Sequence, residues 1–179
     1  MRGGVPIVPS PRRRHLPAIA CVVLLLAAAS AGAAGSPVEV GQPVPEFTLP
    51  GLDGEPVSFH RNIRGKAPVT VFLFMTTACS ACYEELKEIH DFVGKNPGKV
   101  DAWAVAVDLR GAQTVGPYQR SNAFRVKYLI DPKFTLPRAF GFQYTPSLAI
   151  VDAGGVLLHK KGGYAPDARV QDLIRTFLK

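Results

Sequence analysis

The sequence predicts an α/β fold in which helices flank a central mixed β-sheet and an extra β-hairpin precedes the sheet. Two observations favour this class. Apolar runs of strand length alternate with amphipathic segments along most of the chain, an order typical of α/β domains. A Cys-x-x-Cys pair, Cys79 and Cys82, lies where a strand-like run gives way to a helical pattern. Open α/β sheets place their functional sites at the carboxyl ends of their strands, where such a junction lies.

The hairpin is expected between residues 47 and 59. Two short segments that alternate apolar and polar residues, Phe47 to Leu49 and Val57 to Phe59, flank the dipeptide Asp53-Gly54, which favours a tight turn. The next run, Val69 to Phe74, is apolar at nearly every position. This composition predicts a strand that is buried on both faces.

A helix is expected directly after the cysteines. Apolar residues recur at helical spacing from Cys82 to Val93, with Glu84 and Glu88 on the opposite side, and Gly94 is placed to end the helix. The same signals predict the remaining elements. These are a strand (100–107), a loop (108–116), a short helix with proline in its first turn (117–124), a strand (127–130), a helical piece (131–141), a β-hairpin (147–151 and 156–159) and an amphipathic C-terminal helix (170–178).

The N-terminal segment has the pattern of a secretory signal peptide. The basic run Arg12-Arg13-Arg14 precedes an apolar stretch from residue 16 to residue 29, and small residues at A-x-A spacing follow it. The alternative is an uncleaved membrane anchor, because Leu16 to Ala34 nearly reaches the ~20 residues that span a bilayer. Either route takes the cysteines out of the cytoplasm, with the periplasm as the expected compartment.

Length and composition suit one folded domain behind this leader. Of the 179 residues, 47% are hydrophobic, which is enough for a real core. We expect a signal peptide (1–33), a Pro/Gly-rich linker (34–45) and a single domain (46–179). More than half of the formal net charge of +7 comes from four arginines within the first 35 residues. The basic isoelectric point therefore gives no reason to expect nucleic-acid binding.

The Cys79–Cys82 pair is interpreted as a redox dithiol. Free N–H groups and the positive end of the dipole at a helix N-terminus stabilise a thiolate, so Cys79 becomes the nucleophile and Cys82, one turn on, the resolving thiol. The alternatives are a structural disulfide or half of a zinc site. No second pair of Cys or His at short spacing completes such a site. The only other cysteine, Cys21, lies in the leader, and we expect neither a metal nor a cofactor.

Two motifs give the chain a family resemblance over residues 41–179. The pattern Gly-x-x-x-Pro-x-Phe-x-Leu starts at Gly41, and Pro146 is followed by an apolar strand and an Asp-x-x-Gly turn. With the dithiol, these motifs resemble the TlpA-type extracytoplasmic thiol–disulfide oxidoreductases, which have the thioredoxin fold and are related to peroxiredoxins. The chain departs from that family at Ala78 and Ala81, where Trp and Pro are usual. Because residues beside the cysteines help set the reduction potential, these departures affect the direction of electron flow.

The resemblance implies three further site residues. Members of the group place a glutamate at the position of Glu85, three residues after Cys82, where a carboxyl of raised pKa can accept a proton. The alternative is a solvated helix glutamate that pairs with Lys87 or a neighbouring base. Pro146 is the expected cis-proline beside the dithiol, and Thr145 before it would offer its backbone to an extended substrate segment.

The function expected from these residues is thiol–disulfide exchange with partner proteins of the cell envelope, as a reductant. A membrane-linked electron donor would supply the electrons, the protein would act as a monomer, and cytochrome c maturation is a typical setting of the family. Two alternatives stay open. A thiol peroxidase is favoured by Thr76, although Phe72 stands where such enzymes have Pro. A copper-binding protein would use the two thiolates, but the Sco-type copper proteins of this fold space their two cysteines one residue further apart.

Overall fold

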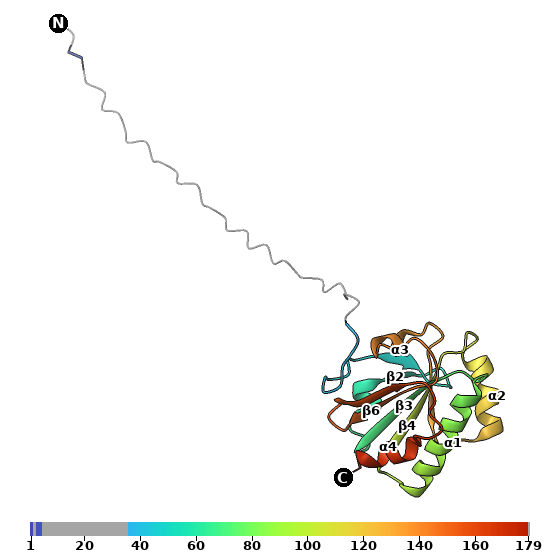
Figure 1. Ribbon diagram of the computed structural model, residues 1–179. Helices are drawn as coiled ribbons and strands as arrows, with labels where there is room; N and C mark the ends of the chain where they lie inside the picture. The colour runs from blue at the N-terminus through green and yellow to red at the C-terminus, as the bar shows by residue number, and fades with distance from the viewer. Residues whose placement is uncertain (2, 5–35, 179) are drawn as a thin grey trace. The chain divides into compact units, whose positions relative to one another are not determined.

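A five-stranded mixed β-sheet lies at the centre of the structure, with the strand order β5-β4-β3-β6-β7 (Figure 1). The structure is a computed structural model that describes residues 1, 3–4 and 36–178. The chain divides into two units, Met1–Ala33 and Ala34–Lys179, and everything below concerns the second. The expected signal peptide or anchor falls almost entirely outside the described residues.

The sheet combines parallel and antiparallel pairing. Its strands are β3 (Val69–Met75), β4 (Val100–Ala106), β5 (Lys127–Ile130), β6 (Ser147–Asp152) and β7 (Leu157–Gly162). Strands β3, β4 and β5 run parallel, whereas β6 pairs antiparallel with both β3 and β7. The predicted mixed sheet and C-terminal hairpin are therefore confirmed.

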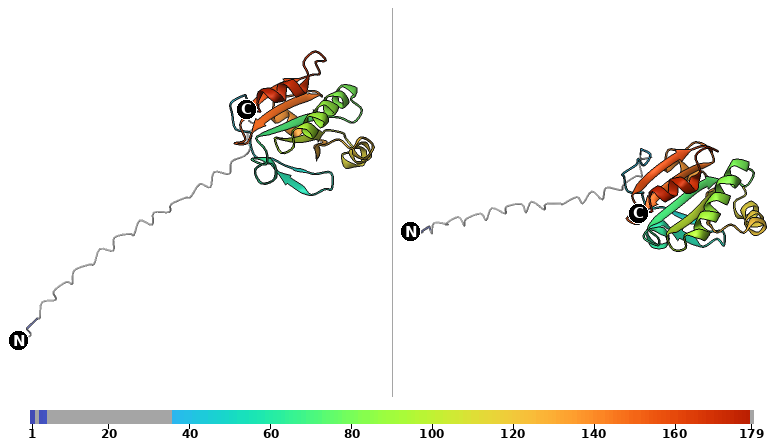
Figure 2. Two further views of the ribbon diagram at one scale, coloured as in Figure 1. Left: turned by 90° about the horizontal axis from the view of Figure 1, so that it is seen from below. Right: turned by 60° about the horizontal axis from the view of Figure 1, so that its bottom comes forward.

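Helices cover both faces of this sheet. On one face lie α1 (Ser80–Lys95), α2 (Ala112–Asn122) and α4 (Val170–Thr176), and Figure 2 shows α1 and α4 side by side. On the other face lie α3 (Thr135–Ala139) and a π-helical turn, η1 (Phe59–Ile63). The order of layers is the one that the sequence predicts.

Strand β3 supplies both hydrophobic cores. All seven of its residues are buried, because the strand is paired on both edges and covered on both faces. Successive side chains of a strand point to opposite faces, so Leu73 and Met75 pack under α1 while Phe72 and Phe74 pack on the other side. The end of β3 is thus held rigidly from both sides, directly before the cysteines.

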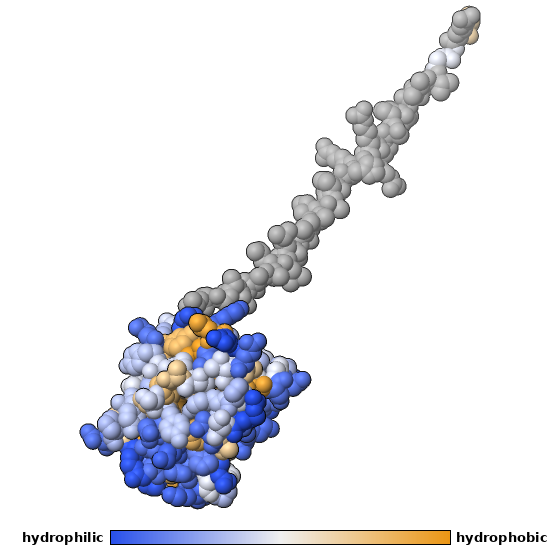
Figure 3. All heavy atoms as spheres, turned by 90° about the vertical axis from the view of Figure 1, so that its right-hand side faces the viewer, coloured by the Kyte–Doolittle hydropathy of each residue, from blue (hydrophilic) through white to orange (hydrophobic). Residues whose placement is uncertain are grey.

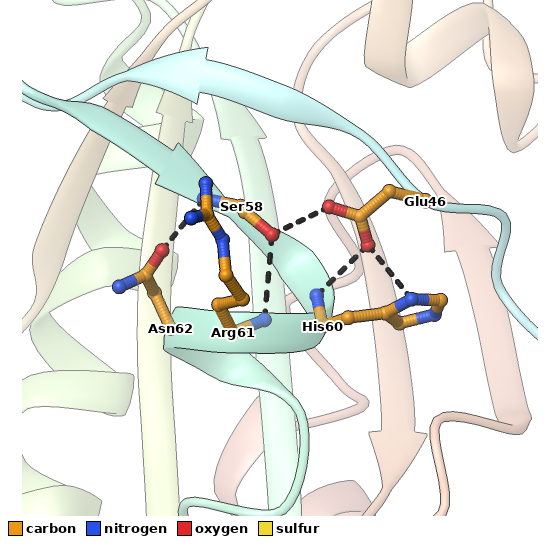
Figure 4. A network of polar contacts seen from close by, with 5 residues as sticks. All are labelled: Glu46, Ser58, His60, Arg61 and Asn62. Carbon is orange, nitrogen blue, oxygen red and sulfur yellow. Dashed lines mark hydrogen bonds and ion pairs between the residues drawn. The ribbon is translucent and has the colours of Figure 1, made fainter.

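The N-terminal hairpin forms a separate two-stranded sheet from β1 (Thr48–Pro50) and β2 (Pro56–Ser58), as predicted. A polar network around Glu46 ties this hairpin to η1 (Figure 4). The Glu46 carboxylate accepts hydrogen bonds from the Ser58 hydroxyl at 2.6 Å and the His60 backbone N–H at 2.9 Å, and it pairs with His60 Nδ1 at 3.1 Å. Ser58 also caps η1 by accepting the Arg61 N–H, and its own N–H is bonded to Asn62.

Some element boundaries differ from the prediction. Helix α2 begins at Ala112, within the expected loop, so that Pro117 lies inside the helix rather than in its first turn. Its entry is made by Gly111, at a φ of 52° that favours glycine. Helix α1 continues past Gly94 to Lys95 and is capped at Asn96. The C-terminal helix ends at Thr176, not at residue 178.

Part of the segment for which the sequence predicts a linker lies on the domain. The side chains of Val38 and Val44 are buried. The Gly41 N–H donates to the Leu157 carbonyl at 2.8 Å, and the Leu157 N–H donates to the Gln42 carbonyl at 2.9 Å. This segment therefore shields the free edge of β7, which would otherwise expose unpaired backbone groups.

Candidate active site

The dithiol lies at the carboxyl end of the central strand. Strand β3 ends at Met75, two threonines follow, and Cys79 is the N-cap of α1. The Cys79 N–H donates to the Thr76 carbonyl at 3.2 Å, which closes the turn between strand and helix. This is the strand-to-helix junction that the sequence predicts.

Cys79 and Cys82 form a disulfide bond, with 5.2 Å between their Cα atoms. The Cys79 sulfur also accepts a hydrogen bond from the Cys82 backbone N–H at 3.1 Å. That N–H is one of the groups at a helix N-terminus without a partner inside the helix. After reduction, the same donor and the helix dipole can stabilise a negative charge on Cys79.

The two sulfurs differ in access to solvent. Cys79 is half-buried and lies between Ala78 and Ser80, which are both exposed, whereas Cys82 has 0% of its surface exposed. An incoming disulfide can therefore reach the first cysteine but not the second. Of the two sulfurs, only that of Cys79 is therefore accessible to another molecule.

Asp108 fixes the turn that leads to the dithiol. Its carboxylate accepts hydrogen bonds from the Thr77 backbone N–H at 3.1 Å and from the Thr77 hydroxyl at 2.6 Å. Asp108 follows β4, the parallel neighbour of β3, and the carboxyl ends of the two strands meet at one edge. The sequence predicts a loop that starts at Asp108 and gives no indication of this contact. The contact between Asp108 and Thr77 is indicated only by the alignment of the ends of β3 and β4.

Glu85 is a residue of α1, and its side chain is buried in the interior of the fold. Its side chain is only 1% exposed, and this burial raises its pKa, because a charged carboxylate is poorly solvated there. A hydrogen bond and ion pair with Lys161 offset part of that rise, with 2.5 Å between Lys161 Nζ and Glu85 Oε1. The second oxygen, Oε2, is buried and has no hydrogen-bond partner among the described residues. The alternative of a solvated glutamate that pairs with Lys87 is therefore wrong.

The sequence does not predict the partner of Glu85, Lys161. It lies 76 positions further along the chain, on β7, directly across from Leu148 of β6. Because opposite residues in a sheet share a face, Lys161 points with Leu148 toward the core under α1. A lysine in a short strand carries no sequence signal for this role.

The loop before β6 reaches the same edge of the sheet. The Thr145–Pro146 peptide bond is cis, as the family resemblance implies, and Pro146 is buried while Thr145 is half-buried. Ser147 is paired with Phe74 near the end of β3, so this loop lies at the end of the sheet that carries the dithiol. The Pro146 carbonyl accepts the Gly163 N–H at 2.8 Å, two residues beyond Lys161.

Aromatic side chains flank the dithiol helix. Tyr83, next to Cys82, makes an edge-on contact with Phe124 at 5.5 Å between ring centroids, and Tyr118 is 6.4 Å from the same ring. Burial raises the pKa of Tyr118, and the nearby Tyr83 and Asp108 add to the rise. Figure 3 shows one face of the molecule, which is largely hydrophilic with hydrophobic patches near its upper edge.

Two further features concern only the residues that the structure describes. Across residues 36–178 and the few described before them, no three His, Cys, Asp or Glu side chains gather in a way that could hold a metal ion. None of the helices in this part of the chain is long and apolar enough to cross a membrane.

The family of the chain follows from a comparison with family models. The model described as the AhpC/TSA family matches residues 40–160, a range that holds the dithiol, Glu85 and Pro146. The chain belongs to the AhpC/TSA family. Comparison with curated proteins gives no significant match.

Solved structures confirm the thioredoxin-like fold of this AhpC/TSA-family chain. A protein of Chlorobium tepidum described as a candidate thiol:disulfide interchange protein DsbE is 21% identical, with a TM-score of 0.69 over 79% of this chain and 99% of that one. StoA from Bacillus subtilis is 20% identical, with a TM-score of 0.59 over 78% and 99%. A secreted disulfide oxidoreductase of Mycobacterium tuberculosis, homologous to E. coli DsbE, is 19% identical, with a TM-score of 0.59 over 74% and 93%.

Proposed function

We propose that this AhpC/TSA-family protein is a thiol–disulfide oxidoreductase that reduces disulfides of partner proteins outside the cytoplasm. The observation that carries the proposal is the Cys79–Cys82 disulfide at the start of α1, with the half-buried Cys79 sulfur accepting a helix N–H. A structural disulfide gains nothing from a hydrogen bond that favours a thiolate. The names of the similar structures, which include disulfide oxidoreductases and a thiol:disulfide interchange protein, support the same class.

The exchange takes two steps. In the first, the Cys79 thiolate attacks one sulfur of a partner disulfide. A bond forms between Cys79 Sγ and that sulfur, and the other partner sulfur leaves as a thiolate. In the second, Cys82 loses its proton and attacks Cys79 Sγ. The Cys79–Cys82 bond forms, the bond to the partner breaks, and the partner has gained the two electrons that the dithiol has lost.

The buried thiol of Cys82 needs a proton acceptor in the second step. Glu85 lies one helical turn after Cys82 on the same flank of α1, where residues three apart are neighbours. Burial raises the pKa of Glu85, which makes its carboxylate a stronger proton acceptor than an exposed one. Thr145, before the cis-proline, would pair its backbone with an extended segment of the partner.

The cellular setting is part of the proposal. The basic and apolar pattern of the leader supports export to the periplasm, and the word "secreted" in the description of the Mycobacterium tuberculosis structure fits the same setting. There the dithiol would draw electrons from a membrane-linked donor and serve proteins such as those of cytochrome c maturation. The protein would act as a monomer.

The reduction potential tests the direction of electron flow. Equilibration of the purified protein with glutathione buffers should give a potential near that of thioredoxin, about −270 mV, if the protein is a reductant. A value near about −120 mV, as in DsbA, would make it an oxidant. Consumption of hydrogen peroxide, rather than reduction of insulin disulfides, would instead favour the thiol peroxidase.

A further inference from the structure

The contact between Glu85 and Lys161 affects the chemistry of the dithiol as well as the stability of the fold. It joins the helix that carries the dithiol to the strand next to the cis-proline loop. Lys161 Nζ lies 2.5 Å from Oε1 of Glu85, and the Lys161 side chain is itself only 19% exposed. A buried carboxylate without a cation would become protonated rather than stay charged.

We propose that Lys161 is a positioning residue that holds Glu85 in its charged form, with Oε2 free to take the proton of Cys82. The inference rests on the proposed function, because it assigns a role within the resolving step. Oε1 is occupied by the ammonium group, and Oε2 has no hydrogen-bond partner among the described residues. A carboxylate that is fixed through one oxygen offers the other as the acceptor.

The shared flank of Cys82 and Glu85 supports this assignment. Cys82 and Glu85 are both buried, on the same flank of α1, and Leu148 under that flank is the residue across from Lys161. Few groups besides Glu85 could receive a proton there. A buried polar atom that is left unsatisfied lowers stability, so Oε2 without a partner is a feature that a purely structural ion pair would not need.

The other ionisable groups around Glu85 can be named by element. On α1, Glu88 lies one turn further along and raises the pKa of Glu85, and the dithiol lies one turn before. On β7, His159 lies on the same side as Lys161, and its pKa is lowered by burial and by that lysine. On α4, Asp172 and Arg175 are engaged with each other.

The buried side chains that β3, β4 and β6 contribute beneath α1 are apolar: alternate residues from Val69 to Met75 and from Val100 to Ala106, with Leu148 and Ile150. Asp152, at the end of β6 across from Val69, accepts a hydrogen bond from the Val156 N–H. Lys161 is therefore the only cation among the described residues for which a contact with Glu85 is found.

The proton balance of the step is simple. The Cys82 thiol gives its proton to Oε2 of Glu85, the sulfur attacks Cys79, and the carboxyl later loses the proton to solvent. The charge of Lys161 does not change during the step. Its effect is to keep the carboxylate ionised, hence able to accept, at pH values where burial alone would leave it protonated.

The test compares wild type with Lys161→Gln, Lys161→Arg and Lys160→Gln. Two quantities are measured against pH: the ¹³C resonance of the Glu85 carboxyl in the reduced protein, and the single-turnover rate at which Cys82 releases glutathione from Cys79. In Lys161→Gln both midpoints should move up by about 1–3 pH units, the size of the effect of one nearby opposite charge. Lys161→Arg, which keeps the charge, should restore both toward wild type.

Lys160→Gln is the matched control. Lys160 is the preceding residue of β7, but it points to the other face of the sheet, where it pairs with Glu39 and bonds to the Val38 carbonyl. Its loss removes a half-buried lysine from the same strand without touching Glu85. Both midpoints should stay where they are in wild type.

The outcomes separate this inference from the proposed function. Wild-type protein that exchanges disulfides, with midpoints that do not move in Lys161→Gln, overturns the inference alone. Wild-type protein that exchanges no disulfide overturns the proposed function, while the carboxyl titration still tests the pair. Should Lys161→Gln not fold, the ¹⁵N resonance of Lys161 Nζ in wild type must change at the pH at which Glu85 titrates. A flat ¹⁵N curve also overturns the inference.

Discussion

The carboxylate of Asp108 holds Thr77 by two hydrogen bonds, from its backbone N–H at 3.1 Å and from its hydroxyl at 2.6 Å. The two residues are 31 positions apart in the chain and meet because β3 and β4 end together. Thr77 lies two residues before Cys79. The position of the dithiol turn is therefore fixed from the neighbouring strand as well as from its own helix.

Removing this anchor should loosen the turn. Asp108→Ala leaves the Thr77 N–H and hydroxyl without their acceptor, and hydrogen bonds to a charged group contribute about 1.5–3 kcal/mol each. Since the site is partly exposed and water can replace the acceptor, we expect a loss of about 1–3 kcal/mol in the free energy of unfolding. Urea denaturation of the oxidised protein measures it.

Thr77→Val is the companion variant, because it removes only the hydroxyl bond and keeps the shape of the side chain. Its loss should be smaller, about 1 kcal/mol. Equal losses in the two variants would mean that the backbone N–H of Thr77 gains nothing from Asp108.

Glu46 should make stability depend on pH in the acid range. The Ser58 hydrogen bond lowers the pKa of Glu46 below its ordinary value of 4.5, with help from His60. Since the folded pKa lies below the unfolded one, the stabilisation is complete above the unfolded pKa and is lost as pH falls through the folded pKa. The carboxylate is about 41% exposed, so the effect should stay within about 4 °C in Tm.

Thermal melts between pH 7 and pH 3 check this expectation. Wild type should lose more stability on acidification than Glu46→Gln, which has no carboxylate to protonate. Glu55→Gln, at the exposed hairpin turn, is the control and should fall with pH as wild type does. Parallel curves for wild type and Glu46→Gln would contradict the assignment.

The sequence predicts those parts of the site that depend on neighbours in the chain. The strand-to-helix junction at Cys79 follows from periodicity over a few residues, and the structure confirms it. The position of Glu85, three residues after Cys82, comes from the family resemblance, and its side chain is buried. Lys161 and Asp108 could not be found this way. Their roles depend on which strands are adjacent and in what register, and one shifted residue in β7 would turn Lys161 to the opposite face.

The helix boundaries show the same limit. Pro117 favours the first turn of a helix, yet α2 begins five residues earlier. The buried side chain of Val115 explains the difference, since it packs into the core beneath that first turn. Packing of one apolar residue outweighs the local preference of a proline, and only the folded structure shows where that residue lies.

Gly162→Ala should change partner exchange without changing the fold. A Cβ at this position would lie 2.8 Å from the hydroxyl of Tyr144, the exposed side chain two residues before Pro146. Because the obstacle is the far end of a flexible side chain, Tyr144 should swing away at a cost below about 1 kcal/mol, offset by the better strand propensity of alanine.

The consequence should be confined to recognition. The rate of insulin reduction should fall by a few fold as the loop loses its aromatic neighbour, while the reduction potential stays unchanged. Tyr144→Ala should have a similar effect, and the double variant should be no slower than either single one. A changed potential in Gly162→Ala would show that the loop acts on the dithiol itself.

Export should leave a shorter protein. Cleavage after the A-x-A sites predicts a mature N-terminus near Gly32 or Ala34, in the soluble fraction outside the cytoplasmic membrane. N-terminal sequencing after cell fractionation decides between cleavage and anchoring. A full-length chain in the membrane fraction would mean that residues 16–34 are an anchor.

The order of attack can be read from trapped intermediates. If Cys79 attacks and Cys82 resolves, Cys82→Ala should still bind a partner sulfur but not release it, and stable mixed disulfides should accumulate. Cys79→Ala should trap at least about tenfold fewer, because Cys82 has no exposed surface and lacks the N–H that Cys79 accepts. Non-reducing gels of envelope extracts, followed by mass spectrometry, count the complexes and name the partners. The double variant sets the background, and equal trapping by the two single variants would reverse the assigned roles.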